Sequence, residues 1–165
     1  MSDGFGSSEL IAALIGSCAT GLFGLIDRIR ERTHKSRLVF NTLKYQTVFL
    51  CAFIRSQDYL NDATLIEKQA ESDDWDGGLL TISAQANYLD IYETFRADIG
   101  VLNEQHARKI LEFYNRAKLF LDSTNPSPQY LSNSTIFDKR SHATETAENI
   151  RALLALGDEI EQFER

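Results

Sequence analysis

Three histidines and two cysteines are the residues best suited to metal binding or nucleophilic catalysis: His34, His106, His142, Cys18 and Cys51. None of them has a partner at the spacing that closes a metal site on a helix. The sequence also lacks a glycine-rich phosphate loop and a nucleophile-bearing turn. We therefore expect no catalytic residue, no metal site and no cofactor, and a protein that is not an enzyme. Both cysteines lie in apolar stretches, which favours a structural role for them.

Acidic side chains gather between residues 61 and 78 in a number that could attract a divalent cation. Their spacing does not match the ligand positions of a calcium-binding loop, so we interpret the stretch as a short helix followed by a solvated acidic loop. Trp75, within this stretch, is expected to dock on the rest of the domain. The five carboxylates are Glu67, Glu71, Asp73, Asp74 and Asp76.

The charges of the chain are unevenly distributed. Its 165 residues include 17 Lys and Arg against 24 Asp and Glu, for a net charge of −7. Between Arg28 and Lys44, six basic residues stand against Glu31 alone, so this stretch carries +5 and the remainder carries −12. A chain this acidic is not expected to bind nucleic acid. The basic residues expected to face an anionic membrane surface are Arg28, Arg30, Arg32, Lys35 and Arg37.

An uncharged apolar run occupies residues 10–26, between Glu9 and Asp27. As a helix it would extend about 25 Å, close to the lower limit for a hydrocarbon layer of about 30 Å. We predict a transmembrane helix over 10–26, an extracytoplasmic tail over 1–9 and a helical cytoplasmic domain over 27–165, because basic residues follow the run. The competing interpretations are a helix buried in a soluble protein or lying at an interface, and a signal peptide, which the acidic start disfavours.

Small residues recur at helical spacing within this apolar run. One row repeats every four residues, and a second row lies beside it. Such rows let helix backbones approach each other closely in a membrane. We therefore predict a homo-oligomer. The residues expected to make the helix–helix contact are Ala12, Gly16, Thr20 and Gly24, with Ser17 and Gly21 from the second row.

The rest of the chain has the periodicity of helices. Apolar residues keep helical spacing from residue 27 to residue 58, and Phe49 is expected to be buried with its apolar neighbours. Both prolines fall within residues 126–128, which leaves the remainder free of the strongest helix breaker. The sequence predicts an all-α fold in which a single transmembrane helix continues into a helical bundle or hairpin-containing domain.

Three further helices are expected after the acidic stretch. One should cover residues 83–99 and end at Gly100 in a left-handed conformation. The next should begin after Asn103, a favoured N-cap residue. The last should cover residues 141–163, with an irregular loop before it.

Part of the sequence resembles a known group of proteins. It contains Ile91-Tyr92-Glu93, then Ile99-Gly100-Val101-Leu102, then Ile110-Leu111-Glu112-Phe113-Tyr114. With its apolar N-terminal run and basic stretch, the chain loosely resembles small uncharacterised bacterial membrane proteins that have an N-terminal span and a helical cytoplasmic domain. The resemblance and the charge pattern imply a single-pass protein of the bacterial inner membrane with its C-terminal domain in the cytoplasm. The resemblance implies no activity.

These patterns favour a membrane-anchored, self-associating helical protein that acts as a structural or interaction module. Its expected partners are membrane lipids, further copies of the chain and a cytoplasmic protein. Two alternatives remain open. One is a membrane-active effector, such as a pore-forming or a stress- or phage-response protein, in which Ser17 and Thr20 line a narrow path. The other is a soluble helical-bundle module with a buried N-terminal helix.

Overall fold

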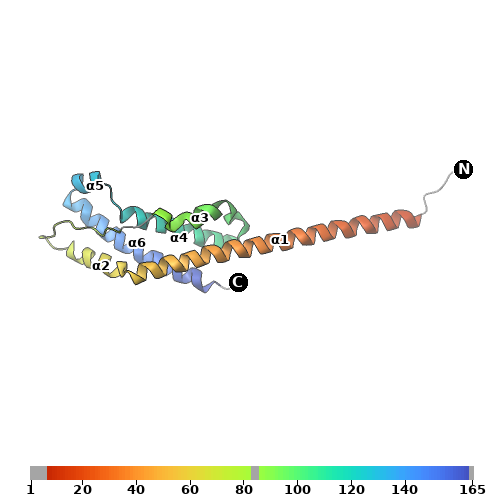
Figure 1. Cartoon of the computed structure of the whole chain (residues 1–165), viewed down its shortest axis with the longest axis horizontal. Coiled ribbons are helices and arrows are strands. Elements are labelled where there is room, and N and C mark those ends of the chain that lie inside the picture. Colours follow the sequence, from red (N-terminus) through yellow and green to blue (C-terminus); the bar gives the residue numbers. More distant parts are fainter. Residues whose placement is uncertain (1–6, 83–85, 164–165) are drawn as a thin grey trace. The chain divides into compact units, whose positions relative to one another are not determined.

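The computed structural model describes residues 7–82 and 86–163, and the side chains of residues 26–82 and 88–163. Every regular element in this part of the chain is a helix (Figure 1), which confirms the predicted all-α class. Six are α-helices, and two, η1 and η2, are short 3-10 helices. In chain order they are α1 (Ser7–Ser56), α2 (Tyr59–Gln69), η1 (Ala86–Leu89), α3 (Asp90–Phe95), η2 (Arg96–Val101), α4 (Glu104–Ser123), α5 (Pro128–Asn133) and α6 (Ile136–Gln162).

The chain divides into two compact units. The first ends at Leu38, and the second covers Val39–Arg165. α1 contributes to both units, since its last turns, up to Ser56, belong to the second. Apart from half-buried Ser36, the described side chains of the first unit are exposed. The buried apolar side chains of the described residues therefore all belong to the second unit.

The predicted location in a bacterial inner membrane is wrong. Among the residues that the structure describes, no helix is both long enough and apolar enough to cross a bilayer. The uncharged run at 10–26 would extend only about 25 Å, against a hydrocarbon layer of about 30 Å. It is also not a separate element, because it lies within the 50-residue helix α1, which continues into charged residues from Asp27 onward.

From Val39 onward, α1 buries one face in the second unit. The buried positions return every three or four residues, as the sequence predicted, because an α-helix has 3.6 residues per turn. Each large apolar side chain removed from water contributes about 1.5–3 kcal/mol to stability. Together with residues of α4 and α6, this face forms the main hydrophobic core. Its members on α1 include Val39, Phe40, Leu43, Leu50, Cys51 and Ile54.

Cys51 is a packed core residue. Burial raises the pKa of its thiol to about 11, so the group stays protonated near neutral pH. Its sulfur lies directly against Gly157 of α6, where a Cβ atom would overlap it. The contact accounts for a glycine inside a long helix, and it agrees with the structural role expected for this cysteine.

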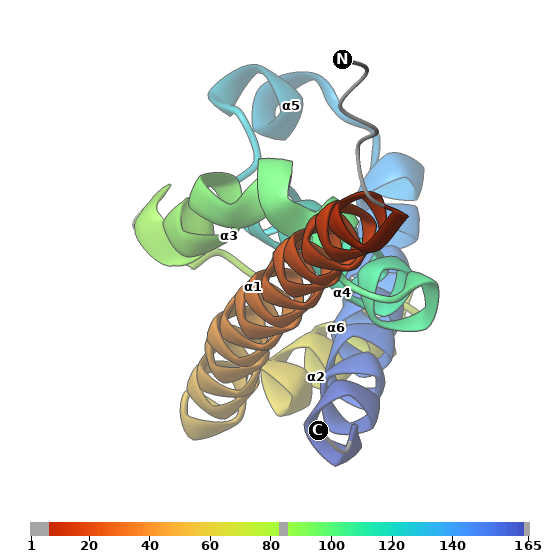
Figure 2. The same ribbon diagram turned by 90° about the vertical axis from the view of Figure 1, so that its right-hand side faces the viewer.

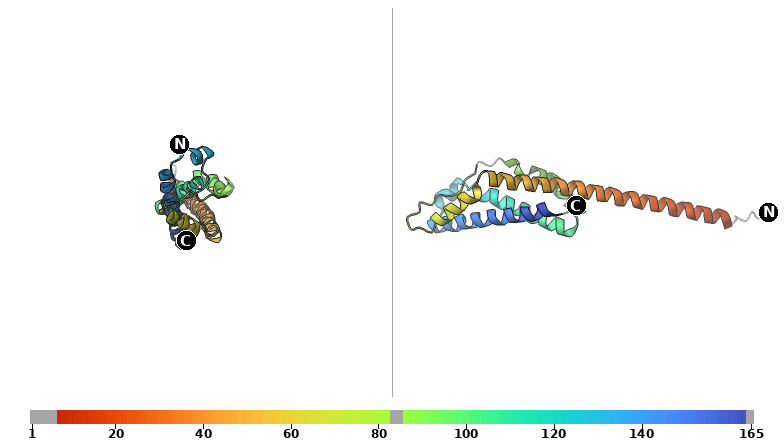
Figure 3. Two further views of the ribbon diagram at one scale, coloured as in Figure 1. Left: turned by 90° about the vertical axis from the view of Figure 1, so that its left-hand side faces the viewer. Right: turned by 90° about the horizontal axis from the view of Figure 1, so that it is seen from below.

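α6 holds the second unit together, because it packs against both α4 and α2 (Figures 2 and 3). The contact with α2 is reinforced by an ion pair between Arg151 and Glu67. On the side of α1, Arg55 donates to Asp158 over 2.6 Å. Both ion pairs lie at the surface, where such pairs contribute about 0–1 kcal/mol, so the apolar contacts dominate the stability of these interfaces.

The two longest helices after α1 begin at side-chain caps. Asn103 accepts a hydrogen bond from the backbone N–H of His106 over 2.8 Å, which confirms the predicted start of α4. α6 begins at Ile136, five residues before the predicted helix, because its N-cap Thr135 and Asp138 form a reciprocal capping box. In it the Asp138 N–H donates to Thr135 Oγ1, and the Thr135 N–H donates to Asp138 Oδ2. Each such cap satisfies backbone donors that a bare helix end leaves unpaired.

The single helix expected over 83–99 is absent from the described part of that range, where η1, α3 and η2 follow one another. One reason is that the Tyr88 carbonyl accepts a hydrogen bond from Gln46 of α1 over 2.7 Å. In a continuous α-helix that carbonyl would accept from the backbone four residues on. Gly100 is also not a left-handed cap, since Gly77 alone among the described glycines has a positive φ.

The acidic stretch forms the end of α2 and an exposed loop, as predicted. Trp75 is buried in a small cluster with Ala70 and Ala143, so it docks on the start of α6. Ser72 is held to α6 by Arg140, whose guanidinium donates to the Ser72 carbonyl over 2.7 Å. Within the part of the chain that the structure describes, no three His, Cys, Asp or Glu side chains are grouped so that they could hold a metal ion.

An aromatic cluster joins α1, α4 and the residue that follows α6. The His106 ring stacks on both Phe40 and Phe163, with ring centroids 4.2 Å and 4.8 Å away, and the two phenylalanine rings are 6.4 Å apart. Lys44 donates to the Phe163 carbonyl over 2.9 Å. Burial, and to a smaller extent the positive charge of Lys44, lower the pKa of His106 below its usual 6.5. The cluster therefore favours a neutral imidazole.

This cluster predicts a stability that falls on acidification. Well above pH 6.5 the His106 ring is neutral in both the folded and the unfolded chain, so its contribution is complete. As the pH falls below 6.5, the unfolded chain takes up a proton more readily than the folded one, and the free energy of unfolding decreases. Urea denaturation at pH 7.5 and pH 5.5 should show this loss, and His106→Gln should reduce it. The exposed His34→Gln is the matched control, and an equal loss in wild type and His106→Gln would contradict the assignment.

Candidate functional site

A groove of about 400 Å³ opens on the second unit, where α1 meets the segment that contains η1 and α3. Its walls are mostly aromatic and aliphatic, which is typical of sites that bind apolar groups. We call it the Tyr45–Phe49 groove. It is lined by Thr42, Tyr45, Gln46 and Phe49 of α1, Tyr88 of η1 and Ile91 of α3.

The apolar side chains of this groove face water. Tyr45 is 66% exposed, Phe49 is 62% exposed and Ile91 is 44% exposed. Tyr45 and Phe49 lie one turn apart, away from the side of α1 that Leu43 and Leu50 bury in the core. Single exposed apolar residues are common, but a hollow lined by several of them marks a binding surface.

A hydrogen-bonded chain holds Gln46 and Tyr88, two of the residues that line the groove. Gln46 donates from Nε2 to the Tyr88 carbonyl over 2.7 Å, and it accepts at Oε1 from the Tyr114 hydroxyl over 2.6 Å. Burial raises the pKa of Tyr114 well above its usual value, so this hydroxyl remains a donor. Because both ends of the Gln46 amide are engaged, its side chain cannot swing into the groove without breaking a buried bond.

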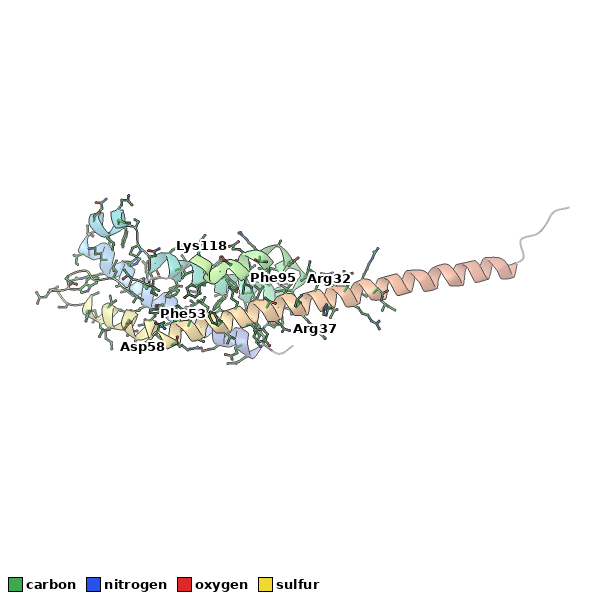
Figure 4. All side chains as sticks on the ribbon, viewed as in Figure 1. Arg32, Arg37, Phe53, Asp58, Phe95 and Lys118 are labelled. Carbon is green, nitrogen blue, oxygen red and sulfur yellow. The ribbon has the colours of Figure 1, made fainter. Side chains whose placement is uncertain are left out.

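Stacked rings fix the far wall. Phe53 of α1, labelled in Figure 4, stacks on Tyr88 with centroids 4.9 Å apart. Four residues after Tyr88, Tyr92 of α3 stacks on Tyr114 with ring centroids 3.9 Å apart. Aromatic pairs of this kind contribute about 0.5–1.5 kcal/mol beyond their buried area. These contacts hold Tyr88 and its neighbours in place, which lowers the cost of ordering the groove when a ligand binds.

α3, the helix that carries Ile91, has two exposed carboxylates. Asp90 precedes Ile91 directly and Glu93 follows it by two residues, and both side chains are exposed. Arg96 lies 3.6 Å from Glu93 in an exposed pair, so it neutralises only part of this charge. A ligand with apolar side chains and positive charges would match both features of the site.

The chemistry that this arrangement supports is binding. Catalysis by general acids, bases or nucleophiles requires titratable side chains within hydrogen-bond reach of each other and of the substrate. The groove lining offers two tyrosine hydroxyls, one amide and one threonine hydroxyl, with apolar surface between them. Such a surface holds an apolar side chain and orients it through a few polar contacts.

The residues predicted for helix–helix packing lie on α1, and their side chains fall outside the described part of the chain. These residues are Ala12, Gly16, Ser17, Thr20, Gly21 and Gly24. Their role stays a prediction. The predicted membrane-surface residues Arg28, Arg30, Arg32, Lys35 and Arg37 also lie on α1, in the first unit, and all five are exposed. Figure 4 labels Arg32 and Arg37 among them.

The Tyr45–Phe49 groove was missed from the sequence. Phe49 was expected to be buried because it falls in the apolar run around Val48 and Leu50, and this expectation is wrong. A helical periodicity reading would have found the signal, since Tyr45 and Phe49 share a side of α1 that the buried row does not include. Helical periodicity could not have shown that Tyr88 and Ile91 line the same groove, because they belong to a separate segment of the chain.

A comparison of the chain with protein-family models, curated proteins and solved structures finds no match in any of the three. The resemblance to small bacterial membrane proteins therefore stays a prediction. Any functional conclusion must rest on the geometry of the chain itself.

Proposed function

We propose that this protein is a helical interaction module that associates with further copies of itself through the Tyr45–Phe49 groove. The observation that supports this most directly is a hollow with two exposed aromatic side chains, Tyr45 and Phe49, among its lining residues. Aromatic residues dominate the binding energy of protein interfaces, especially where they enter or line pockets. Insertion of an amphipathic helix into an apolar groove is a common form of such recognition.

Charge complementarity favours a second copy as the occupant. The second unit carries 12 Lys and Arg against 20 Asp and Glu, a net charge of −8, and two of these carboxylates, Asp90 and Glu93, are exposed on the helix that carries Ile91. Residues 26–38 carry five basic residues against two acidic ones, a net charge of +3. Opposite charges on two surfaces of one chain raise the rate of encounter between copies.

Replacement of Phe49 by serine should abolish most of the self-association. The side chain is largely exposed, so the fold should tolerate the change. Loss of an aromatic anchor at the centre of an interface costs about 2–4 kcal/mol of binding free energy, or roughly a 30-fold to 1,000-fold rise in the dissociation constant. Sedimentation velocity over a range of concentrations should show mass increasing for wild type and a monomer for Phe49→Ser.

Phe137→Ser is the matched control. Phe137 is 76% exposed at the start of α6 and does not line the Tyr45–Phe49 groove. This variant should associate as wild type does. If wild type is monomeric at all accessible concentrations, or if Phe137→Ser abolishes association while Phe49→Ser does not, the proposed function is overturned.

A further inference from the structure

Residues 26–38 of α1 are exposed in the described structure, apart from half-buried Ser36. Ile26 is 43% exposed and Ile29 is 56% exposed, and the basic residues around them are exposed as well. Ile26 and Ile29 are three residues apart, so they lie on the same side of the helix. Most of the stability of a helix in water comes from packing such an apolar face against a partner.

We propose that residues 26–38 of one copy occupy the Tyr45–Phe49 groove of another copy. This inference rests on the proposed function and names the segment that fills the groove. The segment offers apolar side chains for the aromatic rim and basic side chains for the exposed carboxylates of α3. It is continuous with a 50-residue helix, so it is presented to the partner already folded.

The two sides of the contact match in chemistry. Ile26 and Ile29 would pack on Tyr45 and Phe49, where burial of each aliphatic side chain is favourable. Their basic neighbours, including Arg28 and Arg30, would then meet Asp90 and Glu93 of α3 in the other copy. Pairing of two 26–38 segments with each other is disfavoured, because each carries a net charge of +3.

The contact is heterologous, since the donating surface and the accepting surface are different. A heterologous contact repeats from copy to copy and forms either a ring or an open chain. Wild type should therefore form a series of oligomers that grows with concentration. A variant with a defective segment, or one with a defective groove, should be unable to associate with itself.

Mixing two complementary full-length variants tests this directly. Ile26→Ser/Ile29→Ser removes the apolar anchors of the segment and keeps the groove, whereas Phe49→Ser removes the groove and keeps the segment. Each variant alone should be monomeric. An equimolar mixture should form a 1:1 complex that does not grow further, because only one intact segment and one intact groove can meet.

Charge-reversal variants supply a second test of the contact. In the mixed pair, Arg28→Glu/Arg30→Glu in the segment donor should raise the dissociation constant about tenfold. Asp90→Lys/Glu93→Lys in the groove donor should restore part of the affinity. The matched control is Arg108→Glu on α4, which lies outside both surfaces and should leave the dissociation constant unchanged.

The outcomes separate this inference from the proposed function. If Phe49→Ser is monomeric but Ile26→Ser/Ile29→Ser associates as wild type does, the groove functions and its occupant is another surface, which overturns the inference alone. If the equimolar mixture of the two variants stays monomeric, the inference alone is likewise overturned. Binding of residues 26–38 to vesicles of phosphatidylglycerol, lost in the segment variant while self-association is kept, also overturns it. If Phe49→Ser associates as wild type does, both proposals fail.

Discussion

Replacement of Gly157 by alanine is expected to lower the free energy of unfolding by about 2–3 kcal/mol. The position lies inside α6, where alanine would ordinarily gain up to about 1 kcal/mol in helix propensity. That gain is outweighed because the new Cβ would overlap Cys51 Sγ and would lie only 3.4 Å from Phe113 Cε2. Close-packed interiors absorb such an overlap only by shifting side chains or backbone.

Urea denaturation followed by circular dichroism measures this loss. Gly100→Ala is the matched control, since no heavy atom would lie within 4 Å of its Cβ. It should change the free energy of unfolding by no more than about 0.5 kcal/mol. Wild-type stability in Gly157→Ala would show that α1 and α6 are not packed as tightly as the structure places them.

A second substitution should relieve the overlap. Cys51→Ala removes the sulfur and leaves the Cys51 Cβ, which would lie 3.7 Å from the new Cβ at ordinary contact distance. The double variant Cys51→Ala/Gly157→Ala should therefore be more stable than Gly157→Ala alone, although Cys51→Ala by itself is destabilising. If the losses in the free energy of unfolding of the two single variants simply add in the double variant, the overlap with the Cys51 sulfur is not the cause of the loss in Gly157→Ala.

Replacement of Gln46 by leucine is the second change with a large expected effect, a loss of about 2–4 kcal/mol in the free energy of unfolding. The substitution leaves the Tyr114 hydroxyl without its acceptor and the Tyr88 carbonyl without its side-chain donor. Tyr114 is almost fully buried, so water cannot readily replace the lost partner. Release of Tyr88 should also loosen one wall of the groove and weaken self-association.

Tyr114→Phe completes a double-mutant cycle with this change. Alone it should cost about 1–2 kcal/mol, because the Gln46 oxygen then loses its donor. The double variant Gln46→Leu/Tyr114→Phe should lose less stability than the sum of the single losses, by about 1 kcal/mol. Gln105→Leu, at an exposed position of α4, is the control and should be near neutral. Strict additivity within the cycle would mean that the Gln46–Tyr114 bond contributes little.

Local sequence signals determined the helical class and several helix boundaries. Both prolines fall together, and apolar residues repeat every three or four positions, so few segments could form anything but helices. Asn103 begins α4 because a short side chain can bond to the backbone N–H three residues on, an interaction within one turn. A local interaction also fixes the start of α6, where Thr135 and Asp138 form a capping box within one turn. The sequence prediction did not include this capping box.

Interactions between segments decided the features that the sequence left open. Where η1, α3 and η2 replace the predicted helix over 83–99, the Tyr88 carbonyl near the η1–α3 boundary accepts from Gln46 of α1, a partner 42 residues away. The contact between Gly157 and Cys51 also joins distant segments, because it exists only when α1 and α6 pack together. Neither contact produces a periodic pattern in the sequence, because the residues around one partner do not specify which distant residue will pack against it.

The sequence by itself therefore determined an all-helical chain, the buried side of α1 in the second unit and a segregation of basic from acidic residues. Apolar content at 10–26 could not determine a membrane location, because composition alone does not separate a short span from one part of a longer helix. Only the tertiary structure decided that Phe49 faces water beside Tyr88 and Ile91. The physical reason is that periodicity specifies which residues share a side of a helix, whereas packing specifies which sides are covered.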